Sequence, residues 1–182
     1  STKEPHLVIM SHVSNVTGYI LPIKECHELG KKYNPINIVD CAQSLGVVKV
    51  DVKEDFSECD FIIFAGHKSL YGPFGVGGFI YLNNKIKLKE VITGGTGSDS
   101  TNLEMPNESE GFFEAGSYNV YSIAGLNAAL KWIKEVGNEN IFNHEKQLTE
   151  ILIDGLMEID GVEGDIPENL DSHIGVVSFN LS

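Results

Sequence analysis

Three short apolar runs, separated by helical or polar stretches, constrain the fold of this chain more than any other feature. Residues 6–10, 36–39 and 61–64 each have the length and the apolar composition of a buried strand. A helical pattern at 22–32 lies between the first two runs. Strands that alternate with helices are typical of a mostly parallel sheet with crossover connections. We therefore predict an α/β fold built on a mainly parallel central sheet.

The remaining elements also follow from the pattern. The helix that Pro22 opens is expected to place Ile23, Cys26 and Leu29 on one face. The long irregular stretch at 93–118 is more typical of a functional loop than of a linker. The other predicted elements are an extended piece at 47–50, a glycine loop at 72–78 with a strand at 79–82, helices at 121–136 and 139–159, and a strand at 175–181.

The length and the last predicted strand bear on domain organisation. A chain of 182 residues can form one domain, or one domain and a piece of another. The strand at 175–181 has no later segment that could pair with it or cover it. We therefore expect these residues to be part of a longer protein.

Charge excludes some classes of partner. The chain carries 13 basic residues against 26 acidic ones, for a formal net charge of −13 at pH 7. Such a surface repels the phosphates of duplex nucleic acid and an anionic membrane, so neither is expected as a partner. All 13 basic residues are lysines. Because only a guanidinium clamps a carboxylate in a bidentate manner, a clamp for an acidic substrate is expected to lie outside this chain.

Cysteine usage and hydropathy favour a cytoplasmic, soluble protein. Cys26, Cys41 and Cys59 are an odd number at unrelated spacings, which predicts neither a disulfide framework nor a metal site. This usage fits a reducing compartment. No apolar run approaches the ~20 residues that span a bilayer, and the first residues lack a signal-peptide pattern.

Lys68 is the centre of the candidate site. It closely follows the strand at 61–64, so it lies near the carboxyl end of that strand, where open parallel sheets bind their ligands. Position alone favours a solvated surface lysine. Asp40 ends an earlier strand of the same predicted sheet, and Gln43 follows it by about one helical turn. Both side chains are therefore expected at the same edge as Lys68.

An amine, a carboxylate and an amide that converge at one sheet edge are what pyridoxal 5'-phosphate requires. The amine of Lys68 holds the aldehyde, the carboxylate of Asp40 keeps the ring nitrogen protonated, and the amide of Gln43 bonds the phenolic oxygen. His67, next to the lysine, could reach the phosphate. In isolation, Asp40 could be a turn residue and Gln43 a surface residue. Their joint occurrence with Lys68 favours the cofactor site.

Further segments match a known family in its order. The chain resembles class V aminotransferases of fold type I, and within them it is most similar to cysteine desulfurases and selenocysteine lyases. The resemblance covers residues 7–130. It rests on SHVSNVTG at 11–18, VDCAQ at 39–43, FAGHK at 64–68, LYGP at 70–73, GVGG at 75–78, GGTGS at 94–98 and FEAGSYN at 113–119.

The resemblance implies a domain organisation and a set of residue roles. Residues 1–160 would be part of a three-layer large domain that binds pyridoxal phosphate, and 161–182 would begin a smaller C-terminal domain. Lys68 would form the internal aldimine, with Asp40 on the pyridine nitrogen and Gln43 on the phenolic oxygen.

The same resemblance implies roles around the phosphate and the ring. His67 would bind the phosphate, and Asn15 would lie beside the ring and the substrate. Ser117, which replaces the family's usual threonine, would reach the phosphate of the partner subunit's cofactor in a homodimer. Ala65 stands where the family usually has a serine or threonine on the phosphate. One phosphate hydrogen bond is therefore missing, at a cost of about 1.5–3 kcal/mol.

Other residues of the family's site lie outside this chain. Its ring-stacking residue precedes residue 1, and its sulfur-accepting cysteine and carboxylate-binding arginine follow residue 182. None of the three cysteines present is a good substitute. Cys41, beside Asp40, is expected to be a buried and unreactive thiol.

The leading interpretation is part of a cysteine desulfurase-like enzyme that acts on an amino acid, with cysteine favoured, and that uses a sulfur-acceptor protein. A class V aminotransferase or another pyridoxal phosphate lyase is the alternative, because the cofactor residues are shared and the discriminating cysteine lies outside the chain. A third interpretation is a non-catalytic protein of the same fold, with Ala65 as a sign of decay. These 182 residues alone are expected to show weak or no turnover.

Overall fold

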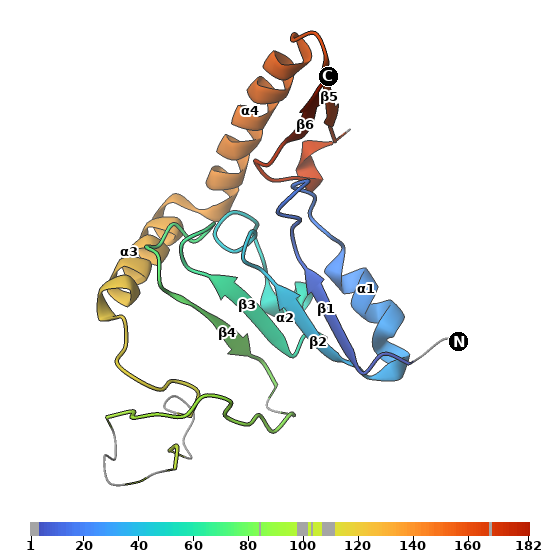
Figure 1. The fold of residues 1–182 in the computed structure, drawn as a ribbon. Helices are drawn as coiled ribbons and strands as arrows, with labels where there is room; N and C mark the ends of the chain where they lie inside the picture. The colour runs from blue at the N-terminus through green and yellow to red at the C-terminus, as the bar shows by residue number, and fades with distance from the viewer. Residues whose placement is uncertain (1–3, 84, 98–101, 103, 107–111, 168) are drawn as a thin grey trace.

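The computed structural model describes residues 4–83, 85–97, 102, 104–106, 112–167 and 169–182 (Figure 1). They form a four-stranded sheet, a two-stranded sheet and several helices. In chain order the elements are β1 (Leu7–Ser11), α1 (Ile23–Gly30), η1 (Lys31–Tyr33), β2 (Ile36–Asp40), α2 (Val52–Asp55), β3 (Phe61–Ala65), β4 (Gly77–Tyr81), α3 (Val120–Val136), α4 (Asn138–Met157), β5 (Val162–Asp165), η2 (Leu170–Ser172) and β6 (Ser178–Leu181).

The larger sheet has the order β1-β2-β3-β4. β1, β2 and β3 run parallel, and β4 is antiparallel to β3. The three predicted strands in the first half of the chain are all present, with bounds that differ by no more than one residue. The prediction of an α/β fold on a mainly parallel sheet is confirmed.

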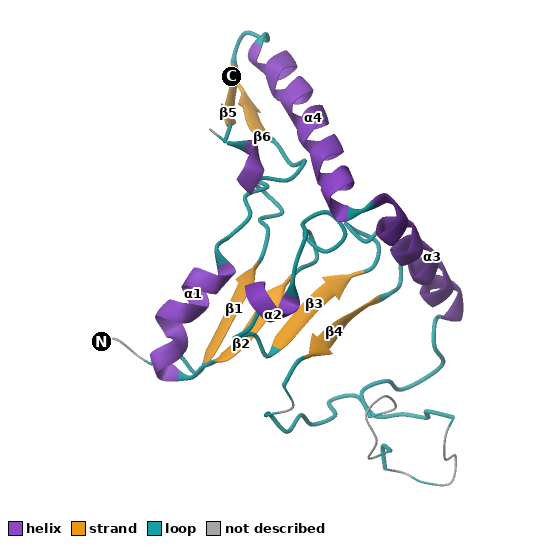
Figure 2. Cartoon of the chain, turned by 180° about the vertical axis from the view of Figure 1, so that it is seen from behind, coloured by secondary structure: helices purple, strands orange, loops and turns teal. Residues whose placement is uncertain are grey.

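Helices α1 and α2 cover one face of this sheet, and α2 lies in front of the strands in Figure 2. Ile23 at the start of α1 and Phe56 after α2 pack in one buried cluster with Val39 of β2 and Ile62 of β3. These side chains are at most 3% exposed. Burial of apolar surface stabilises a fold by about 25 cal/mol per Å². This cluster therefore stabilises the packing of α1 and α2 on the sheet.

The buried face of α1 differs from the prediction at one residue. Ile23 is buried as expected and Cys26 is half-buried, but Leu29 is 80% exposed and His27 takes its place in the interior. Four residues make slightly more than one helical turn, so His27 lies on the same face as Ile23, whereas Leu29, six residues from Ile23, lies on another face. The prediction for Leu29 was wrong.

The opposite face of the sheet carries Leu7 and Ile9 of β1 and Ile63 of β3. These side chains are 48%, 63% and 40% exposed. No helix of the described part of the chain lies over this face of the sheet in Figure 1. The described residues therefore supply a sheet and one helical layer of the three-layer arrangement.

A second core lies beyond the carboxyl ends of the parallel strands. Leu126 and Ile133 of α3 pack there with Val47 and Leu70, which belong to the turns after β2 and β3. Gly137, with a φ of 87°, ends α3 as predicted, and α4 begins at the next residue. From there α4 runs away from the sheet, beside β5 and β6 (Figure 1).

Two predictions about short extended segments need correction. Residues 47–50 form no strand: Val47 lies in a turn, Val48 makes an isolated bridge with Leu45, and residues 49–50 have no regular structure. The last predicted strand is present as β6, but it pairs antiparallel with β5, which the sequence analysis missed. β5 reads VEGD, which is too short and polar to show a strand pattern. The strand that pairs with β6 therefore precedes it in the chain.

The segment before β6 lies against the loop after β1. The backbone N–H of Ile174 donates to the carbonyl of Gly18 at 2.9 Å, and Nε2 of His173 lies 2.6 Å from the carbonyl oxygen of Thr17. Gly18 has a φ of 78°, and a Cβ there would lie 2.7 Å from the His173 ring. These contacts join the C-terminal segment to the edge strand of the larger sheet. The domain boundary between residues 160 and 161 falls between α4 and β5 and stays a prediction.

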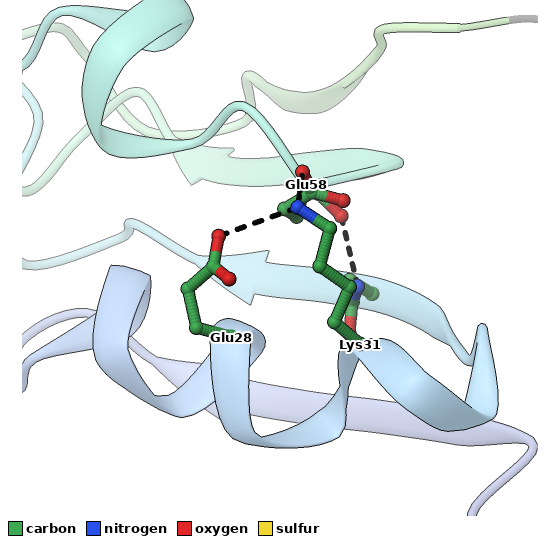
Figure 3. Close-up of polar contacts among 4 residues, drawn as sticks. Glu28, Lys31 and Glu58 are labelled. Atoms are coloured by element: carbon green, nitrogen blue, oxygen red, sulfur yellow. Dashed lines mark hydrogen bonds and ion pairs between the residues drawn. The ribbon is translucent and has the colours of Figure 1, made fainter.

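The amino ends of β2 and β3 are joined by polar contacts (Figure 3). Nζ of Lys31 lies 3.4 Å from a carboxylate oxygen of Glu28 and 2.9 Å from one of Glu58. Nδ2 of Asn37 donates to the carbonyl of Glu58 at 2.8 Å. The ion pairs are exposed and contribute little to stability, but Asn37 is buried and its bond orders the approach to β3.

Gly46 brings together the turns that follow β2 and β3. Its φ is 100°, and a Cβ at this position would lie 2.0 Å from the carbonyl oxygen of Ser69. Oγ of Ser69 in turn donates to the carbonyl of Gln43 at 2.8 Å. The two turns touch at these two points, and only glycine satisfies both the backbone angle and the close approach.

We expect Gly46→Ala to lower the free energy of unfolding by about 3 kcal/mol. Alanine is strained at a positive φ, and its Cβ would overlap the backbone carbonyl of Ser69, which cannot move aside. Urea denaturation measures this change. The matched control is Gly155→Ala in α4, where a Cβ meets nothing within 4 Å, and which should stabilise the chain by about 0.5–1 kcal/mol. Equal stability of the two variants would contradict the close approach.

His27 is buried without a hydrogen-bond partner. Its side chain is 3% exposed, and neither ring nitrogen has a partner within the described structure. Burial lowers the pKa of His27 from its ordinary value of 6.5, while the charges of Glu58 and Asp60 act in the opposite direction. Below about pH 6.5 His27 binds a proton in the unfolded chain but remains neutral in the folded one. The stabilisation by neutral His27 is therefore complete above about pH 6.5 and is lost as the pH falls below it.

We expect the free energy of unfolding of the unaltered chain to decrease between pH 7.5 and pH 5.5, and His27→Leu to make this decrease smaller, while the buried His12, whose pKa burial also lowers, retains part of it. Urea denaturation at several pH values measures the slope. His144→Leu, which changes an exposed histidine on α4, is the matched control. A slope that changes equally in both variants would contradict the role of burial.

Candidate functional site

The parallel register brings three loops to one edge of the sheet. Ser11 at the end of β1 is paired with Asp40 at the end of β2, and Asp40 is paired with Ile63 of β3. The loops that follow these strands therefore leave the sheet at the same edge, which faces α3 and α4 in Figure 1. This arrangement places Asp40 at the edge that carries Lys68, as the sequence predicts.

A tight turn orients the carboxylate of Asp40. Oδ1 of Asp40 accepts a hydrogen bond from the N–H of Ala42 at 2.9 Å, in the manner of an Asx turn. The N–H of Cys41 donates to the carbonyl of Ile63 at 2.8 Å, which extends the pairing of the two strands by one residue. Both Asp40 and Gln43 are half-buried. The turn thus orients the carboxylate of Asp40 and places Gln43 at the same sheet edge.

Lys68 lies on the turn after β3 and is exposed. The N–H of Gly66 donates to the carbonyl of Val76 at 2.9 Å, and the N–H of Tyr71 donates to the carbonyl of Lys68 at 2.8 Å. A Cβ on Gly66 would lie 2.7 Å from the Val76 side chain, so the turn passes close to the glycine loop. The backbone on both sides of Lys68 is therefore fixed, while its side chain is open to solvent.

Lys68 and Gln43 line one cavity of about 420 Å³, which lies between the two turns and helix α4. Its walls include Tyr71 and Glu145 and the apolar side chains of Leu148 and Leu152. This volume is within the range of small-molecule sites. An amine and an amide that converge in such a cavity can bond a carbonyl compound and orient it.

The other predicted site residues lie elsewhere. Asp40 shares the edge but does not line this cavity. His67 is exposed, and its ring lies 5.0 Å from that of Phe74. Asn15 is exposed in the loop after β1. Ser117 lines a second, larger cavity of about 1010 Å³ with residues of β4. The roles of these four residues stay predictions.

The buried cysteines are unsuited to nucleophilic chemistry. Cys41 is 1% exposed, and burial raises the pKa of its thiol to about 12. Burial likewise raises the pKa of the Cys59 thiol to about 11. The thiolate is the reactive form, so both side chains are unreactive near neutral pH. The prediction of a buried, unreactive Cys41 is confirmed. No cluster of potential metal ligands occurs among the residues whose placement is described.

Sequence reasoning missed Tyr71 and Glu145 as neighbours of Lys68. Glu145 lies 77 positions from Lys68 in the sequence, and nothing local relates the two. One signal was present: Glu145 follows the buried Ile141 by four residues and so faces inward on α4. A carboxylate on the inner face of a helix indicates a polar partner.

The whole chain matches a protein-family model. The model is that of aminotransferase class-V, and the match spans residues 2–182. Among curated proteins, the chain is 38% identical over 186 residues to a probable cysteine desulfurase of Pyrococcus abyssi, a match that covers 98% of this chain and 45% of that protein. It is 33% identical to a cysteine desulfurase of Escherichia coli K12, over 98% of this chain and 44% of the relative.

Solved structures give the same result. The apo structure of cysteine desulfurase from Thermococcus onnurineus NA1 has a TM-score of 0.77 and 32% identity, and the match covers 97% of this chain and 44% of that one. A mutant of C-DES with glycine covalently linked to its PLP cofactor has a TM-score of 0.75 and 30% identity, over 97% of this chain and 47% of that one. The chain spans less than half the length of these relatives, and it belongs to the aminotransferase class-V family.

Proposed function

We propose that the chain is part of a pyridoxal phosphate-dependent cysteine desulfurase, in which Lys68 bonds the cofactor. The observation that carries this proposal is the cavity at the carboxyl edge of the sheet, which Lys68 and Gln43 line together. Relatives at 33% and 38% identity are described as cysteine desulfurases, and one similar structure holds PLP. These names support the proposed substrate and cofactor.

The residues at this edge fit the cofactor by their chemistry. The exposed amine of Lys68 would bond the aldehyde, and the amide of Gln43 would bond the phenolic oxygen. The carboxylate of Asp40, oriented by its turn, would hold a proton on the pyridine nitrogen. The imidazole of His67 would bind the phosphate. When bound, pyridoxal phosphate supplies an electron sink for the substrate's alpha carbon.

The amine of Lys68 has a second task. With pyridoxal phosphate bound to a substrate amino acid, the free amine of Lys68 would act as base and acid and would move a proton at the substrate's alpha carbon. The exposed position of Lys68 on a fixed turn suits this role, because the side chain can move while the backbone stays in place.

Two further residues complete the proposed site. Asn15, in the loop after β1, would lie beside the ring and the substrate. Ser117 lines a cavity other than that of Lys68, which is compatible with a role toward the cofactor of a partner subunit. We therefore include a homodimer in the proposal.

The proposed surroundings are a reducing cytoplasm and a sulfur-acceptor protein. Three cysteines without a disulfide support the reducing compartment. None of the helices in the described part of the chain is long and apolar enough to cross a membrane. The two buried thiols cannot serve as sulfur acceptors at neutral pH. The segment 161–182 would be the start of a smaller C-terminal domain.

Addition of pyridoxal phosphate to the chain is expected to give a visible absorbance band that is absent in Lys68→Ala, because that variant lacks the amine. Spectrophotometric titration measures the band. Lys24→Ala, which removes an exposed lysine on α1, is the matched control and should retain it. The same spectrum in the unaltered chain and in Lys68→Ala would overturn the proposed function.

Ala65→Ser is expected to tighten cofactor binding about ten-fold, because it supplies a hydroxyl to a charged phosphate at the end of β3. The same titration gives the dissociation constant. Ala124→Ser, at an exposed position on α3, should leave the constant unchanged. No gain in affinity for Ala65→Ser would show that the phosphate lies elsewhere.

A further inference from the structure

Tyr71 closes the turn that carries Lys68, and its backbone is strained. Its N–H donates to the carbonyl of Lys68 at 2.8 Å. Its φ is 56°, in the left-handed region that residues other than glycine rarely adopt. Such a conformation persists only where surrounding contacts hold it, and it occurs preferentially at functional sites. The contacts of the Tyr71 side chain therefore indicate what this turn depends on.

The Tyr71 side chain reaches two helices. Its hydroxyl donates to Oε1 of Glu145 in α4 at 3.2 Å. Its ring meets that of Trp132 in α3 edge to face, with centroids 5.3 Å apart. The Lys68 turn is thus attached to both helices that follow the sheet in the chain, at points 61 and 74 residues from Tyr71 in the sequence.

Glu145 also lines the cavity that Lys68 lines. Among the residues that line this cavity, Glu145 is the one acidic side chain and Lys68 the one basic side chain. The half-buried Glu145 lies on the inner side of α4, and Oγ1 of the buried Thr149 bonds its carbonyl at 2.7 Å. Burial, followed by the charge of Glu145, raises the pKa of Tyr71 to about 12. The tyrosine hydroxyl therefore stays a donor throughout the neutral range.

We propose that Tyr71 and Glu145 are positioning residues for Lys68. Their hydrogen bond holds the turn against α4, so that the amine of Lys68 stays beside Gln43 in the cavity. The inference rests on the proposed function, because it concerns the bond between Lys68 and the cofactor. Since α4 leads directly into β5, the same bond connects the C-terminal segment with the position of Lys68.

The test measures modification of Lys68 and requires no turnover. The 182-residue chain is incubated with increasing pyridoxal phosphate and reduced with sodium borohydride, and the pyridoxyl group on each lysine is measured by mass spectrometry. Tyr71→Phe and Glu145→Ala should each lower the apparent affinity of Lys68 about three- to five-fold. The double variant should show no further loss, because both changes remove the same bond.

Two features separate positioning from a general structural effect. Glu145→Gln keeps an oxygen that accepts from the Tyr71 hydroxyl, and it should retain most of the Lys68 modification even where Glu145→Ala does not. Modification of the remaining lysines should stay unchanged in every variant. The matched controls are Tyr121→Phe on α3 and Glu150→Ala on α4, which change exposed residues of the same types. Circular dichroism and urea denaturation check that each variant is folded.

The outcomes distinguish the inference from the function on which it rests. Three results would overturn the positioning role and leave the proposed function intact. Lys68 could be modified equally in all variants, or the loss of affinity in the double variant could equal the product of the two single losses. The third result is a loss of modification that all lysines share. If Lys68 in the unaltered chain reacts no more than the other lysines, the proposed function and the positioning role both fail.

Discussion

Gly46 has no side chain, and the carbonyl of Ser69 therefore comes close to its backbone in the space that a Cβ would fill. The hydroxyl of Ser69 then bonds the carbonyl of Gln43. These two contacts hold the backbones of the turns that carry Gln43 and Lys68 against each other. Parallel pairing of β2 and β3 brings the turns to one edge, but it does not by itself bring them into contact. The placement of the candidate site's residues therefore depends on this contact.

The two faces of the sheet have different surroundings although both are apolar. Val39 and Ile62 face α1 and α2 and are at most 1% exposed, whereas Ile9 and Ile63 point to the opposite face and are exposed. Apolar residues on both faces are typical of parallel strands that are covered on both sides. The continuous apolar runs in the sequence therefore predicted buried strands correctly, but they could not indicate which face the helices of this chain would cover.

Much of the fold and part of the site could be predicted from local patterns. Asp40 and Lys68 each closely follow an apolar strand, and parallel strands end at one edge, so their shared edge was predictable without coordinates. Leu29 was assigned to the wrong side of α1 because a regular spacing of three suggested a stripe that does not follow the 3.6-residue turn. β5 was missed because its four residues carry no apolar alternation, and its pairing with β6 alone makes it a strand.

The sequence by itself determined the α/β class, the mainly parallel order of strands and the edge at which Lys68 and Asp40 emerge. These properties depend on periodicity and on the ends of apolar runs, which are local. Only the tertiary structure decided that Lys68 and Gln43 share a cavity, that Glu145 lines the same cavity, and that Cys41 is buried deeply enough to raise its thiol pKa to about 12. Contacts between residues far apart in the chain depend on how turns and helices pack, and no local pattern encodes that packing.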